Sequence, residues 1–433
     1  MDRNMHDGEL PQTHVEGQHN SELIEGEASP AESADFNVES SAARQASSPA
    51  LTESSKPQPI PAIRKHRRVV IERLNGGEPI ISPNDRWWED GVTFNSAALY
   101  LTRSPENDKI IAGLIGPNML TDPRIADGVA VLHYRARPRK DTGYKFNRSF
   151  IGLAVMTPTL ELIYRHPDPV LSPSDNMADP DYLGVEDPRI TQIDGVFYAV
   201  YCGFNPLNEN VPNVTTCLAR STDLRHWEKL GLAQGDINNV PNKDAVLFPN
   251  SVDGQYLMLH RPSTLDIERK VIYFATSDSP TGYWQDRGRI LGASTNAAYA
   301  NSWIGAGSVP IDLGDKRYLI IYHTGHSNDL RDRLYHLDAA IFNFQELSFQ
   351  SHRVRVECTV NELMMPETDH EIHAPYEDSV GNVVFSCGTY EYGDYIYIVY
   401  GGGDTYILGA RMLKQALLDD LADAKVLINS QSA

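Results

Sequence analysis

The chain has 433 residues and a formal net charge of −20 at pH 7, with 41% hydrophobic and 22% charged residues. This acidity argues against nucleic acid or an anionic membrane as a partner, because a polyanion needs a positive surface to bind. No apolar run approaches the roughly 20 residues of a membrane span, and the start MDRNMHDGEL leads into no apolar signal segment.

Residues 1–66 form an acidic Ser/Glu/Pro-rich tail that we predict to be disordered. Its few apolar residues follow no period, so it cannot bury enough apolar surface to offset the entropy of ordering. The basic cluster Arg64–Arg68 ends this tail. A nuclear or nucleic-acid role is open to such a cluster, but the acidic whole favours a solvated charged stretch beside a first strand.

Residues 67–433 have the pattern of an all-β domain. Short aromatic and β-branched runs alternate with Gly, Asp, Asn and Pro clusters, as in a sandwich, barrel or propeller. Five runs share one form: 129–135 (VAVLHYR), 196–203 (VFYAVYCG), 256–262 (YLMLHRP), 318–324 (YLIIYHTG) and 395–403 (YIYIVYGGG). Their spacing fits one four-stranded blade each, which predicts a five-bladed β-propeller. The apolar spacing of 412–427 predicts a short C-terminal helix.

Polar residues stand at the ends of these five runs. Equivalent strands of successive blades point the same way, so we expect their ends to surround one mouth of the central channel. The residues concerned are Tyr134, Arg135, Tyr201, His260, Arg261, Tyr322, His323 and Tyr400. Tyr and His at strand ends also commonly satisfy backbone groups at a rim, and this alternative stays open for some of them. It explains less well why several cations gather there in so acidic a protein.

The stretch GVEDPRIT (184–191) lies one strand before VFYAVYCG, and NKDAVLFPN (242–250) lies one strand before YLMLHRP. We therefore expect Asp187 and Lys243 to occupy matching places and to face the same mouth. A carboxylate opposite a Lys/Arg/His cluster can protonate a glycosidic oxygen while an anion attacks from the other side. Several cationic donors suit phosphate as that anion.

The sequence resembles the mannoside phosphorylases of glycoside hydrolase family 130 over nearly all of residues 78–420. The resemblance rests on the order and spacing of WWEDGVTFNSAALYL, HYRARP, GVEDPRIT, KDAVLFP, LMLHRP, WIGAGSVPI, YLIIYHTGH and IVYGGGDTYILGA. It implies a five-bladed propeller that cleaves β-1,2- or β-1,4-linked manno-oligosaccharides by inverting phosphorolysis. The product would be α-mannose 1-phosphate, with inorganic phosphate as co-substrate and no cofactor or metal.

The resemblance also implies roles for individual residues. Asp187 is the expected general acid, passing its proton through a mannose hydroxyl, while Glu186 and Arg189 are expected to be structural. The expected phosphate-binding residues are Arg135, Lys243, His260, Arg261, His323 and Arg220. The expected substrate-binding residues are Asn95, Ser96, Glu377 and Asp404, to which the strand-end argument adds Tyr201 and Tyr322.

Two other functions stay open from the sequence. A β-mannoside hydrolase on the same scaffold would use water and a second carboxylate, for which Glu367 and Glu377 are available. A non-catalytic sugar-binding propeller would be expected to lack Asp187 or the cations. His323 and His326 form an H-x-x-H without the helical H-E-x-x-H of a zinc protease. The scattered cysteines 202, 217, 358 and 387 fit reduced thiols in a cytoplasmic protein, and a homo-oligomer is compatible with the sequence.

Overall fold

The computed structural model describes residues 68–139, 148–263, 270–293, 296–329, 332–347, 354–376 and 379–431, with the backbone alone for 426–431. The tail predicted to be disordered, residues 1–66, lies outside the described residues, and so does Glu377.

Five antiparallel sheets form the blades of a β-propeller, which confirms the predicted fold. The first strands of blades V, I, II, III and IV contact one another in that order, so these strands line the axis. Blade I contains β2 (Val92–Thr102), β3 (Gly128–Arg137), β4 (Phe150–Met156) and β5 (Leu162–Arg165). Blade II contains β6 (Gly184–Ile193), β7 (Val196–Phe204), β8 (Val214–Ser221) and β9 (Glu228–Leu232).

The remaining blades repeat this arrangement. Blade III contains β10 (Asn242–Leu247), β11 (Tyr256–Pro262), β12 (Ile272–Ser277) and β13 (Gln285–Leu291). Blade IV contains β14 (Asn301–Ala306), β16 (Arg317–Ser327), β17 (Arg333–Asn343) and β18 (Arg355–Met364), with β15 (Ile311–Asp312) paired to β16. Blade V contains β19 (Val384–Tyr392), β20 (Tyr395–Gly402), β21 (Tyr406–Leu413) and β1 (Glu72–Arg73).

The ring closes through β1, which comes from the beginning of the domain and completes the last blade by pairing with β21. Arg73 on β1 forms an ion pair with the buried Glu371, Nε to Oε1 at 2.8 Å, and Tyr400 donates to the same oxygen at 2.7 Å. Between each pair of neighbouring blades lies a cluster of buried hydrophobic side chains. These clusters supply the burial that holds a propeller together.

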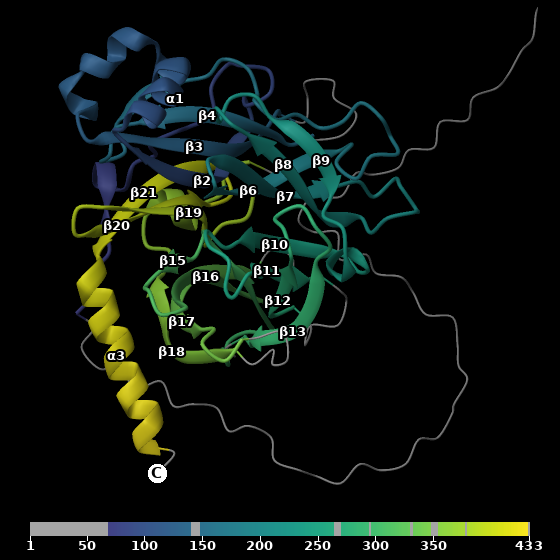
Figure 1. Cartoon of the computed structure of the whole chain (residues 1–433), viewed down its shortest axis with the longest axis vertical. Coiled ribbons are helices and arrows are strands. Elements are labelled where there is room, and N and C mark those ends of the chain that lie inside the picture. Colours follow the sequence, from purple (N-terminus) through teal and green to yellow (C-terminus); the bar gives the residue numbers. More distant parts are fainter. Residues whose placement is uncertain are drawn as a thin grey trace, which may run out of the picture.

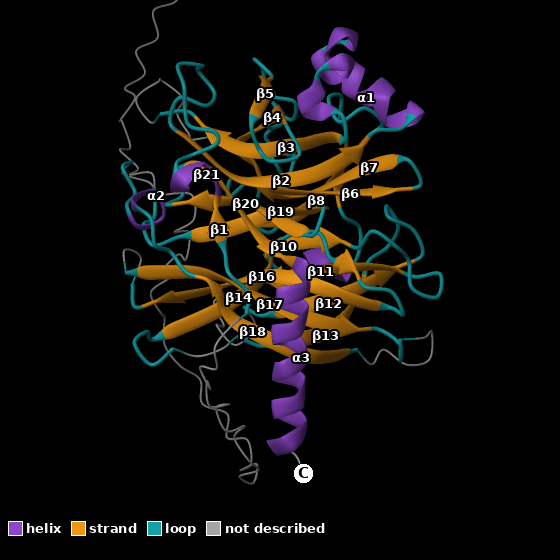
Figure 2. Cartoon of the chain, turned by 90° about the vertical axis from the view of Figure 1, so that its left-hand side faces the viewer, coloured by secondary structure: helices purple, strands orange, loops and turns teal. Residues whose placement is uncertain are grey.

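Helices lie outside the ring. The C-terminal helix α3 (Lys414–Gln431) confirms the prediction and packs on β18. It runs beyond the strands, at the opposite end of the molecule from α1 (Figures 1 and 2). The shorter helices are α2 (Asp369–Ile372), η1 (Leu74–Gly77), η2 (Pro117–Thr121), η3 (Pro123–Ile125) and η4 (Asp236–Asn238). In the described part of the chain, no helix is long and apolar enough to cross a membrane.

The all-β pattern did not predict α1 (Pro105–Ile115), which lies between β2 and β3. Its boundaries are nevertheless marked in the sequence. The hydroxyl of Ser104 accepts a hydrogen bond from the Asn107 N–H at 3.1 Å, Pro105 occupies the first turn, and Gly116 follows the last residue with φ 90°. These are N-cap, N1 and C-terminal signals of a helix.

Candidate active site

The five predicted repeats are the second strands of the five blades: β3, β7, β11, β16 and β20. Side chains alternate between the two faces of a strand, so each tyrosine and the residue after it face opposite ways. The tyrosines pack between blades, and three of them donate to buried acids: Tyr134 to Glu89 at 2.7 Å, Tyr201 to Asp181 at 2.9 Å and Tyr400 to Glu371 at 2.7 Å. In β11 this position is held by His260. The residues that follow the four tyrosines and His260 are Arg135, Cys202, Arg261, His323 and Gly401. These residues, rather than the tyrosines, lie beside the polar groups of the axis.

The inner strands carry β-bulges near their beginnings. Register shifts occur at Asn95 in β2, at Asp187 in β6, at Asp244 in β10 and at Cys387 in β19. Asn95, Asp187 and Asp244 have positive φ values of 46°, 48° and 53°. A bulge re-aims a side chain, and a non-glycine residue with positive φ is a strained position that is common at functional sites.

The motif EDPR is therefore part of a strand and not a turn. Pro188 follows the bulge residue inside β6, at a place where no ladder hydrogen bond is lost. The bulge leaves Asp187 buried, with a 4% exposed surface. Its Oδ1 accepts hydrogen bonds from Asn95 Nδ2 at 2.9 Å and from Arg135 Nη1 at 3.2 Å. Arg135 also contacts Glu186, Nη2 to Oε1 at 2.5 Å.

These contacts set the charge of Asp187. Burial raises the pKa of Asp187, but the positive charges of Arg135 and Arg189, followed by the Asn95 hydrogen bond and Lys243, outweigh burial and hold this pKa below its usual range. Asp187 is therefore held as an anion.

A second buried carboxylate, Asp244, lies at the same place in blade III. Its Oδ2 lies 2.8 Å from Arg261 Nε and 3.3 Å from His323 Nε2, and its Oδ1 accepts a bond from Arg189 Nη2 at 3.3 Å. Burial raises the pKa of Asp244, but Arg261, His323 and Arg189 hold it below its usual range. Gly305 is required here, since a Cβ on it would lie 2.1 Å from Asp244 Oδ2.

Arg189 connects blade II to blade IV across the axis. Its Nε donates to the Gly307 carbonyl and its Nη2 to the Ala306 carbonyl, both at 3.0 Å, while its Nη1 donates to the Asp187 carbonyl at 3.0 Å. Arg189 is 1% exposed. The side chain thus ties the Asp187 bulge to the backbone of blade IV, in keeping with the structural role expected from the sequence.

Asp187 and Lys243 were predicted to hold equivalent positions in blades II and III, but their positions differ by one residue. Asp244 holds the place of Asp187, and Lys243 holds that of Glu186, because the register shift begins directly after Lys243 and after Glu186. Lys243 still acts on the site, since its charge lowers the pKa of Asp187. The sequence reasoning missed Asp244, although V-E-D-P and N-K-D-A align as a repeat when their aspartates are matched.

The structure brings together only some of the predicted phosphate-binding residues. Arg135, Lys243, Arg261 and His323 lie around the two aspartates. His260 occupies the tyrosine position of its strand and contacts Asn242 at 3.0 Å and Asp286 at 3.6 Å. Arg220 is not at the site: it lies toward the far end of blade II, opposite Glu228, in an exposed ion pair at 2.8 Å.

The predicted substrate-binding residues also separate into two groups. Asn95 lies in the site, and its buried Oδ1 has no hydrogen-bond partner within the described residues. Ser96 is buried and donates to the Ala97 carbonyl at 2.8 Å. Asp404 is buried at a positive φ of 46° in the turn between β20 and β21, next to Thr405, whose carbonyl accepts a bond from the Thr93 N–H of β2. Tyr201 and Tyr322 belong to hydrophobic clusters between blades.

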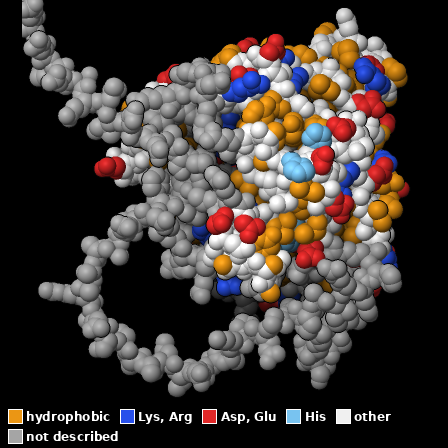
Figure 3. Space-filling model, turned by 180° about the vertical axis from the view of Figure 1, so that it is seen from behind, with side chains coloured by type: hydrophobic (Ala, Val, Ile, Leu, Met, Phe, Trp, Pro, Cys, Tyr) orange, Lys and Arg blue, Asp and Glu red, His pale blue; other side chains and the backbone are white. Residues whose placement is uncertain are grey.

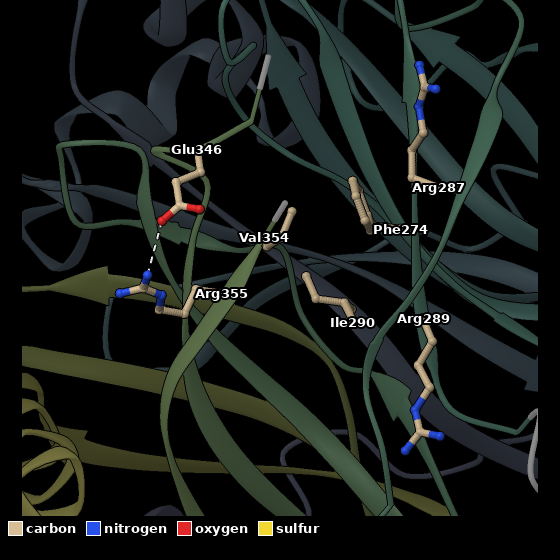
Figure 4. A pocket seen from close by; sticks show the side chains of 7 residues that line it. All are labelled: Phe274, Arg287, Arg289, Ile290, Glu346, Val354 and Arg355. Atoms are coloured by element: carbon tan, nitrogen blue, oxygen red, sulfur yellow. Dashed lines mark hydrogen bonds and ion pairs between the residues drawn. The ribbon is translucent and has the colours of Figure 1, made fainter. Parts of the chain in front are cut away.

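An open cavity of about 420 Å³ lies elsewhere, between the outer strands of blades III and IV. Figure 4 shows Arg287 and Arg289 pointing away from its centre, while Arg355 pairs with Glu346 at 3.0 Å. None of the predicted site residues lines it. Glu367, the described candidate for a hydrolytic base, is an exposed residue paired with Arg73 at 2.8 Å. Neither the cavity nor Glu367 adds a functional group to the residues around Asp187 and Asp244.

Comparisons with known proteins identify the family of the chain and support its fold. A family model described as beta-1,4-mannooligosaccharide phosphorylase matches residues 130–422. The chain is 31% identical to a 1,2-beta-oligomannan phosphorylase of Thermoanaerobacter sp. (strain X514), over 80% of this chain and 98% of the relative. It is 30% identical to a beta-1,2-mannobiose phosphorylase of the same organism, over 78% and 95%. The solved beta-1,2-mannobiose phosphorylase of Listeria innocua superposes with a TM-score of 0.61 at 21% identity, over 81% and 99% of the two chains, and supports the fold.

Proposed function

Because this chain belongs to glycoside hydrolase family 130, the mannoside phosphorylase family, we propose that it cleaves β-linked manno-oligosaccharides by phosphorolysis and releases α-mannose 1-phosphate. The relatives that match it over most of its length are named for β-1,2-linked substrates. We therefore propose β-1,2-linked mannosides as the substrate and inorganic phosphate as the co-substrate.

The observation that carries the proposal is a buried carboxylate among cations. Asp187 lies at the axis with Arg135, Lys243 and Arg189 close enough to lower its pKa. A sugar hydroxyl can donate to the unpartnered Asn95 Oδ1, which places the sugar beside Asp187. A dianion is drawn to the same cluster, since charge-assisted bonds to Lys and Arg are the strong ones in recognising phosphate.

The reaction balances without another reactant. An oxygen of HPO₄²⁻ forms a bond to the anomeric carbon, the glycosidic C–O bond breaks, and the leaving oxygen takes a proton that comes from Asp187. The hydrogen carried by the attacking phosphate then restores the proton on Asp187. Attack and departure on opposite faces of the ring invert the configuration, as one acid and one external nucleophile require.

The test is incubation of the protein with β-1,2-mannobiose and β-1,4-mannobiose, each with and without phosphate. We expect mannose 1-phosphate from the β-1,2 substrate, at a rate that saturates with phosphate. Release of free mannose without phosphate would contradict phosphorolysis and make the protein a hydrolase. Cleavage of the β-1,4 substrate alone would refute the proposed linkage but not the reaction.

Lys243→Ala separates phosphate binding from sugar binding. Loss of one charge-assisted bond, worth roughly 1.5–3 kcal/mol, should raise the KM for phosphate about 10- to 150-fold. The KM for the mannoside should change much less. Arg220→Ala is the matched control, because Arg220 is an exposed cation far from the axis, and it should leave both constants unchanged. Equal effects of the two variants on the phosphate KM would remove Lys243 from the site.

A further inference from the structure

Blade IV contains a second polar cluster, separate from the aspartates of the axis. Asp338 Oδ1 lies 3.1 Å from His336 Nδ1, His336 Nε2 lies 3.1 Å from His326 Nε2, and His326 Nδ1 lies 2.8 Å from Ser302 Oγ. We call this row of four residues the blade IV relay. Asp338, His336 and His326 are at most 2% exposed, whereas Ser302 is partly exposed. The relay thus runs from a buried carboxylate to a hydroxyl at the surface.

The relay crosses three strands on one face of the sheet. Ser302 lies on β14 opposite His326 on β16, and His336 and Asp338 come from β17. The carboxylate is fixed from two more sides: the Thr324 hydroxyl donates to Asp338 Oδ2, and the Glu362 N–H of β18 donates to Oδ1 at 2.6 Å. Such a buried, connected network is rigid and holds its outer end in one orientation.

Strand spacing places the outer end of the relay near the proposed active site. Ser302 and His326 lie three residues from Gly305 and His323, the pair that contacts Asp244. Three residues of a strand span about 10 Å. From Gly305 to Ser302, the chain is followed toward the beginning of β14. Asn95, Asp187 and Asp244 also lie near the beginnings of their own inner strands. Tyr299 stacks on His326 with ring centroids 5.5 Å apart and is also partly exposed.

The nitrogen atoms of the relay fix the polarity of Ser302. A neutral histidine has one donor and one acceptor nitrogen. When neutral His336 carries its proton on Nδ1, which faces the Asp338 carboxylate at 3.1 Å, its Nε2 can only accept. His326 then donates through Nε2 and accepts through Nδ1. The Ser302 hydroxyl must then donate to His326, which leaves only the lone pairs of Oγ for a ligand. A proton added to Nε2 of His336 reverses the two bonds beyond it: His336 donates to His326, and His326 donates to Ser302. The contact between His336 and Asp338 keeps its direction, and the Ser302 hydroxyl becomes a donor to the ligand.

From this geometry we propose that Ser302 and Tyr299 form a saccharide-binding position at the rim of blade IV, and that the blade IV relay sets whether Ser302 accepts or donates a hydrogen bond to a sugar hydroxyl. This inference rests on the proposed function for the identity of the sugar. An aromatic ring beside a hydroxyl with fixed polarity is the combination that orients a polar ligand in a binding site.

The charges around the relay decide at which pH His336 is neutral, with Ser302 accepting from the ligand, and at which pH it is protonated, with Ser302 donating. Burial lowers the pKa of His336, but the Asp338 hydrogen bond and charge, with Glu362 as a further negative group, outweigh it, and the pKa is raised above 6.5. Burial and the neighbouring His336 lower the pKa of His326 to about 4. The relay therefore takes up its proton at His336, and it does so as the pH falls through the raised pKa.

The first test compares Ser302→Ala with the wild type in the phosphorolysis of a β-1,2-mannotriose. Loss of one neutral hydrogen bond should raise the KM for the sugar roughly 3- to 10-fold and leave the KM for phosphate unchanged. Ser327→Ala is the matched control, because Ser327 lies one residue beyond His326 and faces the other side of the sheet, and it should match the wild type. A sugar KM within twofold of the wild type in Ser302→Ala would overturn the proposed position.

The second test follows the relay itself. In the wild type, the KM for the sugar should change with pH as His336 titrates, and His336→Gln, which cannot be protonated, should abolish this change while kcat keeps its pH profile. Nitrogen-15 NMR of labelled histidines in the full chain gives a readout that needs no activity. We expect a proton on Nδ1 of His336 and on Nε2 of His326 at high pH, and the opposite tautomer of His326 would overturn the relay. This spectrum stands even if the protein cleaves no mannoside, so the two proposals can fail separately.

Discussion

At the scale of single residues, the ionised state of Asp187 differs from the protonated state that its proposed role requires. A general acid must carry a proton, but Asp187 is held as an anion by Arg135 and Arg189. A phosphate dianion adds two negative charges to this cluster, and nearby negative charge raises the pKa of a carboxyl group. Phosphate and the catalytic proton should therefore bind together, each promoting the binding of the other.

This coupling can be measured by calorimetry. Phosphate binding to the wild type should take up protons, seen as a binding enthalpy that depends on the ionisation heat of the buffer. Asp187→Asn should show less uptake, because only the titration of phosphate itself remains, and it should lose about 10²–10⁴-fold in rate. Identical uptake in the two proteins would show that Asp187 does not change its protonation when phosphate binds.

At the scale of strands and helices, the features that could be predicted from the sequence are those that repeat at a regular spacing. The five repeats predicted five blades because each second strand has the same alternating form. Periodicity does not show which face of a strand a tyrosine takes. The prediction that Tyr201 and Tyr322 lie in the site is wrong for this reason, since both pack between blades. Asp244 was missed because a bulge changes the register by one residue, and that shift is visible only when the strands are paired. The helix α1 was missed although its end signals are present.

The docking of α3 depends on a carboxylate beneath it. Glu357 of β18 accepts bonds from Arg317 at 2.8 Å, from Asn343 at 2.7 Å and from Lys425 of α3 at 2.9 Å. Burial raises the pKa of Glu357, but these bonds lower it to about 2. A carboxyl group whose folded pKa is depressed stabilises the protein above its unfolded pKa, and this stability is lost as the pH falls from about 4.5 toward 2.

Glu357→Gln should therefore lower the Tm at neutral pH, and the difference from the wild type should shrink as the pH falls through that range. Thermal unfolding from pH 7 down to pH 3 measures it. Glu346→Gln is a suitable control, since Glu346 and its partner Arg355 are both exposed and such pairs contribute little. A difference that stays constant with pH would mean that Glu357 is not held as an anion.

At the scale of the whole molecule, the ring is closed by a two-residue strand. β1 pairs with β21 through Glu72 and Arg73, and Arg73 reaches the buried Glu371. Acidic and basic side chains are interspersed over the face shown in Figure 3. Residues 1–66 carry 11 of the 58 acidic residues and lie outside the described structure. The strand that closes the ring, β1, therefore follows the acidic tail and is not part of it.

Two truncations separate the tail from the closure. Removal of residues 1–66 should leave the Tm and the activity nearly unchanged, because a segment of this composition adds no core contacts. Removal of residues 1–77 also deletes β1 and leaves Glu371 buried without Arg73, and loss of one partner of a buried pair should lower the Tm by roughly 5–15 °C. A large drop in Tm with the first truncation would show that the tail packs on the propeller.

The bulges of the inner strands have a consequence for how such a protein can change over generations. Asn95, Asp187 and Asp244 share a backbone conformation with positive φ, which asparagine and aspartate tolerate better than other residues that carry a side chain. The codons of these two amino acids differ by a single base. The amide proposed to hold a sugar and the acid proposed to donate a proton are thus one mutation apart at equivalent backbone positions. In this ring, catalysis could be gained or lost by one nucleotide change, with every strand left in place.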